Sequence, residues 1–563
     1  MSLCPQLLPS VPDDTARIAR AAFRRGNPYV LLRDRLGAVF ADSDFADLYP
    51  KRGQPAYAPW RLALVTLMQF REGLSDRQAA EAVRGRIDWK YLLALDLTDH
   101  GFDFSVLCEF RARLLQHGAT ERLLARLLDA AREGGLLKAR GRNRTDSTHV
   151  LAAVRDLNRL ELLGETLRAT LNAISIAAPD WLRAVALAEW HERYDRRVED
   201  MRLPDAGPKR DAYSVQVGTD GFLLLDALDG AEAPAAVRGL AEIGVLRRVW
   251  ARHFERDEAG SDSDGSAGER AGHSVQLRPT QGRGPGDRVE SPYDTEARFR
   301  SKAGTNWTGY MVHLTETCDD GKPHLITHVQ TMAAPVDDGE ATTPAHTALR
   351  DKGLLPAVHL VDTGYLDAEL LVATRRDFGI DLAGPARADE RWQAREGKGF
   401  AAADFSVDWE RKQATCPQGA VSASWTPALD SRDAQVIKIK FSSSDCGSCQ
   451  HLADCTRDTR ARRCLTLRAH EQHIALVGAR HRETTAEFAA LSADRAGIEG
   501  TISQAVRGFG LRRSRYAGRA KTHLQHVATA AAMNLVRMTE WLGGAEMATT
   551  RRSKFRALMA QVA

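Results

Sequence analysis

Apolar side chains recur every three or four positions through residues 1–135, a spacing that predicts amphipathic helices rather than strands. The clearest expected helix begins at Pro59 and ends at Gly73, with proline at its start and glycine at its stop. Ser75 followed by Gln78 has the spacing of a capping box and predicts a second helix directly after it. The further helices expected in this region cover residues 76–84, 89–95 and 105–132.

The two short helices that follow Gly73 carry basic side chains, namely Arg77, Arg84, Arg86 and Lys90. A helix, a tight turn and a second helix with exposed cations would suit a helix-turn-helix DNA reader. An ordinary helical bundle explains the same pattern equally well. The residues alone leave both interpretations open.

The pattern changes to alternation and short apolar runs after residue 141, and helices and strands then follow one another. The Gly-, Ser-, Asp- and Arg-rich stretch 255–291 predicts a flexible loop or linker. Asp319 to Lys322 predicts a hairpin turn between two strands. The expected strands are 142–150, 307–316, 323–331 and 358–362, and the expected helices are 151–202, 343–352, 367–376, a helix through 495–509, and 522–542. This order predicts an α/β fold with a mixed sheet.

Composition narrows the class of protein. Hydrophobic residues make up 43% of the 563 residues, so large cores can form. No apolar run approaches the roughly 18 residues of a membrane span, and the amino terminus has no signal-peptide pattern, so we expect a cytoplasmic protein without a membrane partner. The net charge is only +4, but basic runs occur at 138–144 and 507–521. Such runs suit a polyanionic partner, although a single charged run is usually a solvated face.

Three acidic residues stand in settings that can bring them to one site. Asp362 ends the apolar run Val-His-Leu-Val, where a strand is expected to stop, and Asp146 lies within the strand 142–150. Glu499 lies on an amphipathic helix, one turn after Arg495. Carboxylates at strand ends are suitable ligands for divalent ions in phosphoryl transfer. For Asp146 a polar strand residue, and for Glu499 an ion pair with Arg495, are the plain alternatives.

Taken in order, the motifs TDSTHV, TGYMVHLTE, HLVDTGY, Arg495-x-x-x-Glu499 and RRSRYAGRAK resemble the DDE transposases of bacterial insertion sequences. The resemblance runs from about Phe45 to Leu542 and is to the subgroup with a helical amino-terminal domain and a cysteine-bearing insert before the final glutamate. Many relatives have tyrosine where this chain has Ser492 and lysine where it has Val506. The nearest cation to that second position is Arg507.

The resemblance implies a ribonuclease-H-like core in which Asp146, Asp362 and Glu499 bind two Mg²⁺ ions, with Mn²⁺ as a substitute. It also implies metal-dependent cleavage at transposon ends and attack of the freed 3′-hydroxyl on target DNA. An oligomer, expected to be a dimer, would act on paired ends of double-stranded DNA. The residues expected to contact DNA are Arg142, Arg144, Arg495, Arg507, Arg512, Arg513, Arg515 and Lys521. A catalytically inactive descendant that only binds DNA is the alternative.

Five of the eight cysteines fall between Cys416 and Cys464, which favours a metal over disulfides in a cytosolic protein. A C-x2-C pair with two more cysteines in reach can form a structural Zn²⁺ site. Relatives share the Cys-Pro-x-Gly and C-x2-C-x5-C elements. The expected ligands are Cys416, Cys446, Cys449 and Cys455, with Cys464 as the alternate, and reduced cysteines in a mobile loop are the plain alternative.

These patterns predict five parts of the chain. They are a helical DNA-binding domain (1–135), a catalytic core (136–150 with 291–385 and 476–545), a helical insert and linker (151–290), a cysteine-bearing insert (386–475) and a tail (546–563).

Overall fold

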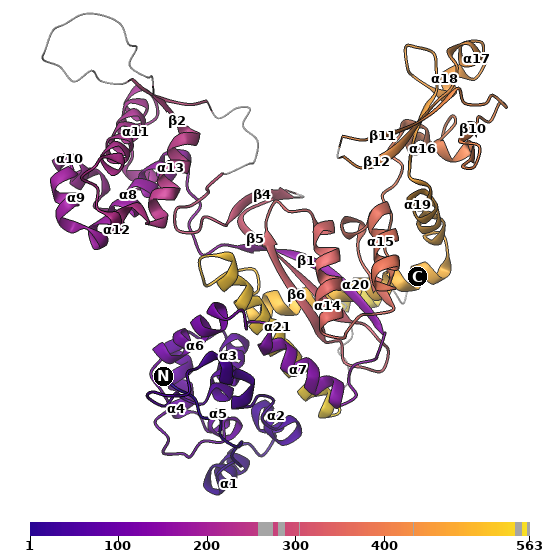
Figure 1. The fold of residues 1–563 in the computed structure, drawn as a ribbon. Helices are drawn as coiled ribbons and strands as arrows, with labels where there is room; N and C mark the ends of the chain where they lie inside the picture. The colour runs from indigo at the N-terminus through magenta and orange to yellow at the C-terminus, as the bar shows by residue number, and fades with distance from the viewer. Residues whose placement is uncertain (257–273, 280–287, 303, 432, 546–553, 560–563) are drawn as a thin grey trace, which may run out of the picture.

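The computed structural model describes residues 1–256, 274–279, 288–302, 304–431, 433–545 and 554–559. A central mixed sheet carries the N-terminal helices on one side, while a helical insert and a cysteine-bearing insert extend from it in different directions (Figure 1). No helix in the described part of the chain is long and apolar enough to cross a membrane.

The N-terminal region is helical, as its periodicity predicts. The predicted caps are present, because the Ser75 and Gln78 side chains form a capping box and Gly73 adopts a left-handed conformation after the preceding helix. The single helix expected over 105–132 is instead two helices, separated by a turn at Gly118. The elements are α1 (Asp13–Ala22), α2 (Pro28–Leu36), η1 (Asp42–Leu48), α3 (Pro59–Glu72), α4 (Asp76–Gly85), α5 (Ile87–Leu92), α6 (Ser105–Gln116) and α7 (Arg122–Glu133).

The cations expected to be exposed on the second and third of these helices are largely engaged within the protein. Lys90 is buried, and its Nζ donates to the backbone oxygens of Asp96 and Asp99. Arg86 is paired with Glu72 and Asp88. Arg84 is paired with Glu81 on the surface. This arrangement favours the helical-bundle interpretation of α4 and α5 over a basic reading helix.

Among the described residues, six strands form the central sheet, in the order β4-β5-β1-β7-β8 with β6 also paired to β5. The strand β1 is antiparallel to β5 and parallel to β7. The short strand β4, which the sequence did not predict, extends the N-terminal half of β5. The strands are β1 (Arg142–Leu151), β4 (Arg298–Lys302), β5 (Thr305–Thr317), β6 (Ile326–Ala333), β7 (Val358–Leu360) and β8 (Asp381–Ala383).

Helices cover both faces of this sheet. The helices α20 and α21 pack on β1 and β6, and α14 and α15 pack on β6 and β8. The hydrophobic core of the N-terminal helices is continuous with the side chains of β5, β6 and α21, so no break in the core occurs near residue 135. These elements are η3 (Asp338–Ala341), α14 (Thr342–Asp351), η4 (Thr363–Tyr365), α15 (Ala368–Phe378), α19 (His470–Arg482), α20 (Ala486–Phe509), α21 (Arg519–Leu542) and α22 (Lys554–Met559).

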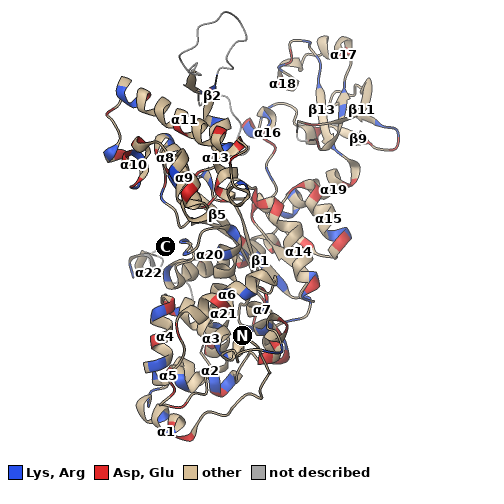
Figure 2. Ribbon diagram, turned by 60° about the vertical axis from the view of Figure 1, so that its left-hand side comes forward, with Lys and Arg blue, Asp and Glu red and all other residues tan. Residues whose placement is uncertain are grey.

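The helical insert leaves the sheet at the end of β1 and has a core of its own, which includes Leu163, Leu167, Leu224 and Trp250. Basic and acidic residues are interspersed over its helices (Figure 2). Much of the linker predicted at 255–291 lies outside the described residues, but its described parts include a short strand pair. The elements are α8 (Arg159–Ala177), α9 (Pro179–Val185), α10 (Ala188–Tyr194), η2 (Asp200–Arg202), α11 (Pro208–Asp229), α12 (Ala235–Arg238), α13 (Ala241–His253), β2 (Phe254–Arg256) and β3 (Val275–Leu277).

The cysteine-bearing insert follows β8 and is built on a three-stranded antiparallel sheet, β11-β12-β13. Its small core contains Phe405, Ile439, Phe441 and Leu465. The insert therefore has apolar packing of its own in addition to its cysteines. The elements are α16 (Trp392–Glu396), η5 (Ala402–Asp404), β9 (Ser406–Asp408), β10 (Gln413–Thr415), β11 (Ser424–Leu429), β12 (Gln435–Lys440), α17 (Ser443–Gly447), α18 (Leu452–Cys455) and β13 (Cys464–Arg468).

Candidate active site

Two aspartates lie at matching positions on neighbouring parallel strands. The register pairs Arg144 of β1 with Leu360 of β7. Asp146 and Asp362 each come two residues later, so the strand geometry brings the two carboxylates to the same edge of the sheet. The Asp362 side chain also accepts a hydrogen bond of 2.8 Å from the Gly364 amide, which fixes it at the start of η4.

Burial and neighbouring negative charge make this edge of the sheet unfavourable for another anion. The pKa of Asp146 is raised to about 6, chiefly by burial. The carboxylates of Asp362 and Asp338 add to this effect, while the Ser147 amide and Arg495 oppose it. A divalent cation between such carboxylates would relieve both effects. The oxygen donors present are therefore of the kind that Mg²⁺ prefers.

Arg495 links Glu499 to the edge of the sheet where Asp146 lies. On α20, Arg495 Nη1 lies 3.7 Å from Asp146 Oδ2, and Arg495 Nη2 lies 3.5 Å from Glu499 Oε1. The Glu499 side chain is 68% exposed, whereas those of Arg495 and Asp146 are 20% exposed. The ion pair expected from their spacing is thus present, and the same arginine joins Glu499 to the strand that carries Asp146.

A buried charge cluster fixes α20 against the sheet. Glu316 of β5 is fully buried and accepts hydrogen bonds from Arg144 Nε at 2.7 Å and Arg537 Nη1 at 2.8 Å. Thr501 of α20 donates to the same carboxylate at 2.7 Å. Burial opposes ionisation, but the two arginines outweigh it and hold the pKa of Glu316 below its ordinary value. A Cβ added at Gly497 of α20 would overlap the Arg144 guanidinium, so glycine permits this close approach.

The expectation that Arg144 contacts DNA is therefore wrong, because its guanidinium is buried and committed to Glu316. Arg142 is paired with Asp494 and Asp320. Arg515 donates to the Leu74 backbone oxygen and lies over the Phe70 ring, so it joins the core to the N-terminal helices.

Other predicted DNA contacts stay accessible. Arg512 donates to Thr148 Oγ1 at 2.8 Å, which places it along β1 from Asp146. Within the described residues, the exposed side chains of Arg507, Arg513 and Lys521 make no hydrogen bond or ion pair.

Asp338 is a further acidic residue near the site. Asp338 begins the short helix η3 between β6 and α14, and its side chain is buried. Burial opposes its ionisation, but the hydrogen bond and charge of Lys302 hold the pKa of Asp338 below its ordinary value. Lys302 lies on β4, a strand that the sequence did not predict, so no local pattern could have indicated this pair.

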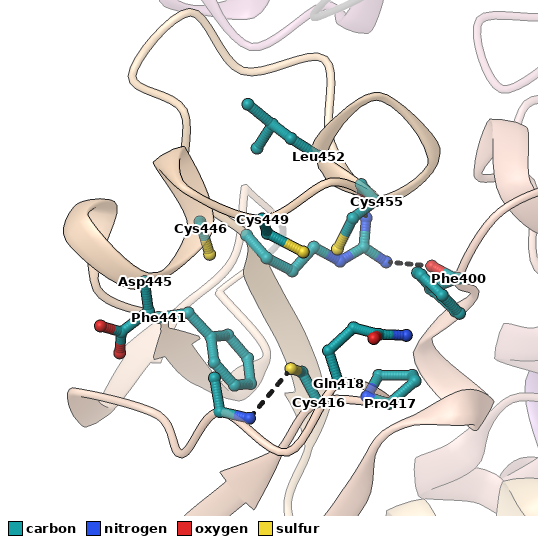
Figure 3. Close-up of a pocket in the computed structure, with 12 residues that line it drawn as sticks. Phe400, Cys416, Pro417, Gln418, Phe441, Asp445, Cys446, Cys449, Leu452 and Cys455 are labelled. Carbon is teal, nitrogen blue, oxygen red and sulfur yellow. Dashed lines mark hydrogen bonds between the residues drawn. The ribbon is translucent and has the colours of Figure 1, made fainter.

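Four cysteines of the insert line one pocket. Cys416, Cys446, Cys449 and Cys455 point toward it from the loop after β10, from α17, from the turn after α17 and from α18 (Figure 3). The Ala420 amide donates to Cys416 Sγ at 3.3 Å, as amides do to metal-bound sulfur. Cys464, the alternate ligand, is exposed and does not line this pocket.

Metal-ligand geometry is not formed at either location. Among the residues that the structure describes, no group of three or more His, Cys, Asp or Glu side chains is arranged closely enough to hold an ion. The donor chemistry nevertheless fits, with carboxylates near β1 and β7 and thiols in the pocket.

The sheet order and the helices on both its faces define a ribonuclease-H-like fold with a helical N-terminal region. Two family models match the chain: one described as "Transposase DDE domain" over residues 415–539, and one described as "Transposase domain (DUF772)" over residues 18–113. No curated protein matches it. The chain belongs to the DDE transposases of the insertion-sequence type. The first match includes Glu499 and the cysteines, whereas Asp146 and Asp362 lie between the two matches.

Proposed function

We propose that this transposase is an active enzyme that binds the terminal inverted repeats of its insertion sequence and catalyses cleavage and strand transfer at their ends. The observation that carries the proposal is the register of β1 and β7, which brings Asp146 and Asp362 to one edge of the sheet with Arg495 linking them to Glu499. An inactive descendant would have no need to keep three acids in this arrangement.

Asp146, Asp362 and Glu499 would hold two Mg²⁺ ions, for which Mn²⁺ would substitute. When bound, such ions activate the attacking water or 3′-hydroxyl and stabilise the leaving oxygen of the phosphodiester. The protein contributes positioning: β1 and β7 fix two carboxylates, and α20 brings the third. Arg495 holds Glu499 toward Asp146 and, once those acids bind ions, is free to contact a phosphate.

The DNA would approach along the exposed basic side chains beside β1. Arg507, Arg512, Arg513 and Lys521 support this path, because Arg512 lies next to the strand and the other three have no partner among the described residues. Such contacts set the position of a duplex without reading its sequence. We further propose that the protein acts as an oligomer on paired ends and on target DNA, in the cytoplasm where the DNA of a cell without a nucleus lies.

We also propose one structural Zn²⁺ in the cysteine-bearing insert, held by Cys416, Cys446, Cys449 and Cys455. Two observations support this zinc site: the four cysteines line one pocket, and the Ala420 amide donates a hydrogen bond to Cys416 Sγ. Thiolates would be the bound form, so burial, which raises the pKa of Cys455 to about 11, would oppose binding until the ion replaces the thiol proton. Metal analysis of purified protein, beside a Cys446→Ser variant, tests this proposal.

The five-part division of the chain remains our proposed domain organisation. The two inserts support it with separate cores. The N-terminal helices share their core with the sheet, and we propose that they orient the catalytic core on DNA rather than act as an independent reader.

The test of activity is cleavage of a duplex that carries the terminal repeats flanking the coding sequence, with Mg²⁺ and then Mn²⁺. We expect Asp146→Asn, Asp362→Asn and Glu499→Gln each to reduce cleavage by at least about 100-fold while duplex binding is retained. Asp351→Asn, an exposed aspartate at the end of α14, is the matched control and should cleave normally. Tight binding without cleavage by the intact protein in either metal would instead establish the inactive descendant.

A further inference from the structure

Asp338 connects three segments around the candidate site. It begins η3, and its side chain is buried between β1 and β4. Its Oδ1 accepts a hydrogen bond of 3.2 Å from Ser147 Oγ, and Ser147 directly follows Asp146. Its Oδ2 accepts a hydrogen bond of 2.8 Å from Lys302 Nζ. One carboxylate therefore holds β1 and the end of β4 together.

The same carboxylate lies against the turn that carries Asp362. A Cβ added at Gly364 would lie 3.1 Å from Asp362 Oδ1 and 3.2 Å from Asp338 Oδ2, so the two acids flank one glycine. Thr342, at the start of the helix after η3, donates to the Tyr365 backbone oxygen at 2.9 Å. The segment of Asp338 is thus joined by side chains to the segments of both catalytic aspartates.

These contacts continue behind the site. Tyr365 OH and His313 Nδ1 are 2.6 Å apart, and His313 is the residue that faces Ser147 across β1 and β5. The side chains of Ser147, Asp338, Tyr365 and His313 therefore lie on the same side of the sheet. Asp146, the residue before Ser147 on β1, points to the opposite side, toward α20, because side chains alternate along a strand.

Placing a third carboxylate near two others carries an electrostatic cost, which its lysine partner reduces. Such an arrangement is common where a protein must hold charged groups in one geometry for function. Lys302 contributes the only ion pair of Asp338 within the described residues. The pair therefore acts as a brace at the edge where the proposed metal ligands lie.

We propose that Asp338, braced by Lys302, is a positioning residue that sets the separation of Asp146 and Asp362 for metal binding. This inference rests on the proposed function. Asp338 acts through Ser147 and through the Gly364 turn, and it does not need to touch the metal or the DNA.

Two substitutions separate positioning from simple charge. Asp338→Asn keeps the size of the side chain but breaks the ion pair, and Lys302→Met breaks the same pair from the other side. Loss of positioning weakens metal binding in both variants. An effect of charge alone weakens binding when the carboxylate is removed and strengthens it when the lysine is removed. Asp337→Asn is the matched control, because Asp337 is the exposed neighbour of Asp338.

The measurement is Mn²⁺ binding by electron paramagnetic resonance, with the full-length protein and the terminal-repeat duplex, beside the Asp362→Asn variant to identify the site. We expect Asp338→Asn and Lys302→Met each to weaken Asp362-dependent Mn²⁺ binding by about 10-fold, the size of effect seen for residues that orient metal ligands. Asp338→Glu, which restores the charge, should recover part of the loss, and Asp337→Asn should bind as the intact protein does.

Tighter Mn²⁺ binding by Lys302→Met, or unchanged binding by both variants, would overturn this inference while Asp362-dependent cleavage still upheld the proposed function. If the intact protein neither cleaves the duplex nor binds Mn²⁺ in an Asp362-dependent way, the proposed function and the inference both fail. Circular dichroism would show whether a loss of Mn²⁺ binding in Asp338→Asn comes from unfolding. In that case the result for Lys302→Met, a substitution at a half-exposed position, would decide whether the inference holds.

Discussion

Glu316 provides the sharpest test of how the helix that carries Glu499 is held. Its carboxylate is fully buried and is the shared acceptor for Arg144, Arg537 and Thr501. In Glu316→Ala the two arginines keep their charge without a counter-ion. Hydrogen bonds to charged groups contribute about 1.5–3 kcal/mol each, but these three share one acceptor and their contributions do not add.

Removing one partner of a buried ion pair typically costs 3–5 kcal/mol, so we expect Glu316→Ala to lower the free energy of unfolding by about 4 kcal/mol. The matched control is Glu81→Ala on α4, which breaks an exposed pair with Arg84 whose side chains are 63% and 46% exposed. That surface pair is expected to contribute no more than about 1 kcal/mol.

Urea unfolding followed by circular dichroism measures both variants, and hydrogen exchange of the α20 amides shows whether the loss is local to that helix. The reasoning would be refuted if Glu316→Ala changed the free energy of unfolding by no more than Glu81→Ala does. Faster exchange spread evenly over the chain, with none specific to α20, would contradict the role we give this cluster in holding the helix.

Three further predictions concern stability and domain contacts. Burial lowers the pKa of His328 and of His526 to about 3, whereas a histidine in the unfolded chain has its ordinary pKa near 6.5. Below about pH 6.5 the unfolded chain therefore binds protons at these two side chains that the folded chain does not bind. Stability should therefore fall by about 1.4 kcal/mol per pH unit for each histidine as pH decreases from 6.5 toward 3, and a urea midpoint that is constant between pH 7 and 5 would contradict this. Gly497→Val should destabilise the protein by about 1–3 kcal/mol, because the new side chain would displace Arg144. The control is Gly500→Val on the same helix, which meets open space and so measures only the effect of valine on the helix itself. Equal urea midpoints for the two variants would refute the argument. Arg515→Ala should expose α3 to limited proteolysis near Leu74 while Arg513→Ala does not, and identical digestion patterns would show that the Arg515 contact is not what joins the two regions.

The sequence predicted well those elements whose signals are local. The helix after Pro59, its glycine stop and the capping box at Ser75 are all present, because caps and periodicity depend on residues within one or two turns. The strand 142–150 and the hairpin at 319–322 were placed for the same reason.

What the sequence could not show are contacts between distant segments. Nothing local distinguishes Arg144, which is buried against Glu316, from a basic residue that faces solvent. Asp338 likewise has the neighbours of a surface turn, yet it is buried and pairs with Lys302 of β4. Lys90 has the spacing of an exposed helix cation, yet its Nζ donates hydrogen bonds to two backbone oxygens of the following loop.

The helical insert separates two strands that pair along almost their whole length. Leu151 pairs with Gly309, which also pairs with Arg298 at the start of β4, so the chain leaves and re-enters the sheet at neighbouring positions. Closing such a loop costs more as the intervening chain lengthens, by about 0.6 kcal/mol for each doubling. Because the insert has its own core, it can fold first and bring its two ends together before β1 and β5 meet. During synthesis, β1 would leave the ribosome first but could pair with β5 only after the whole insert had been made. The central sheet would then be among the last parts of the chain to form.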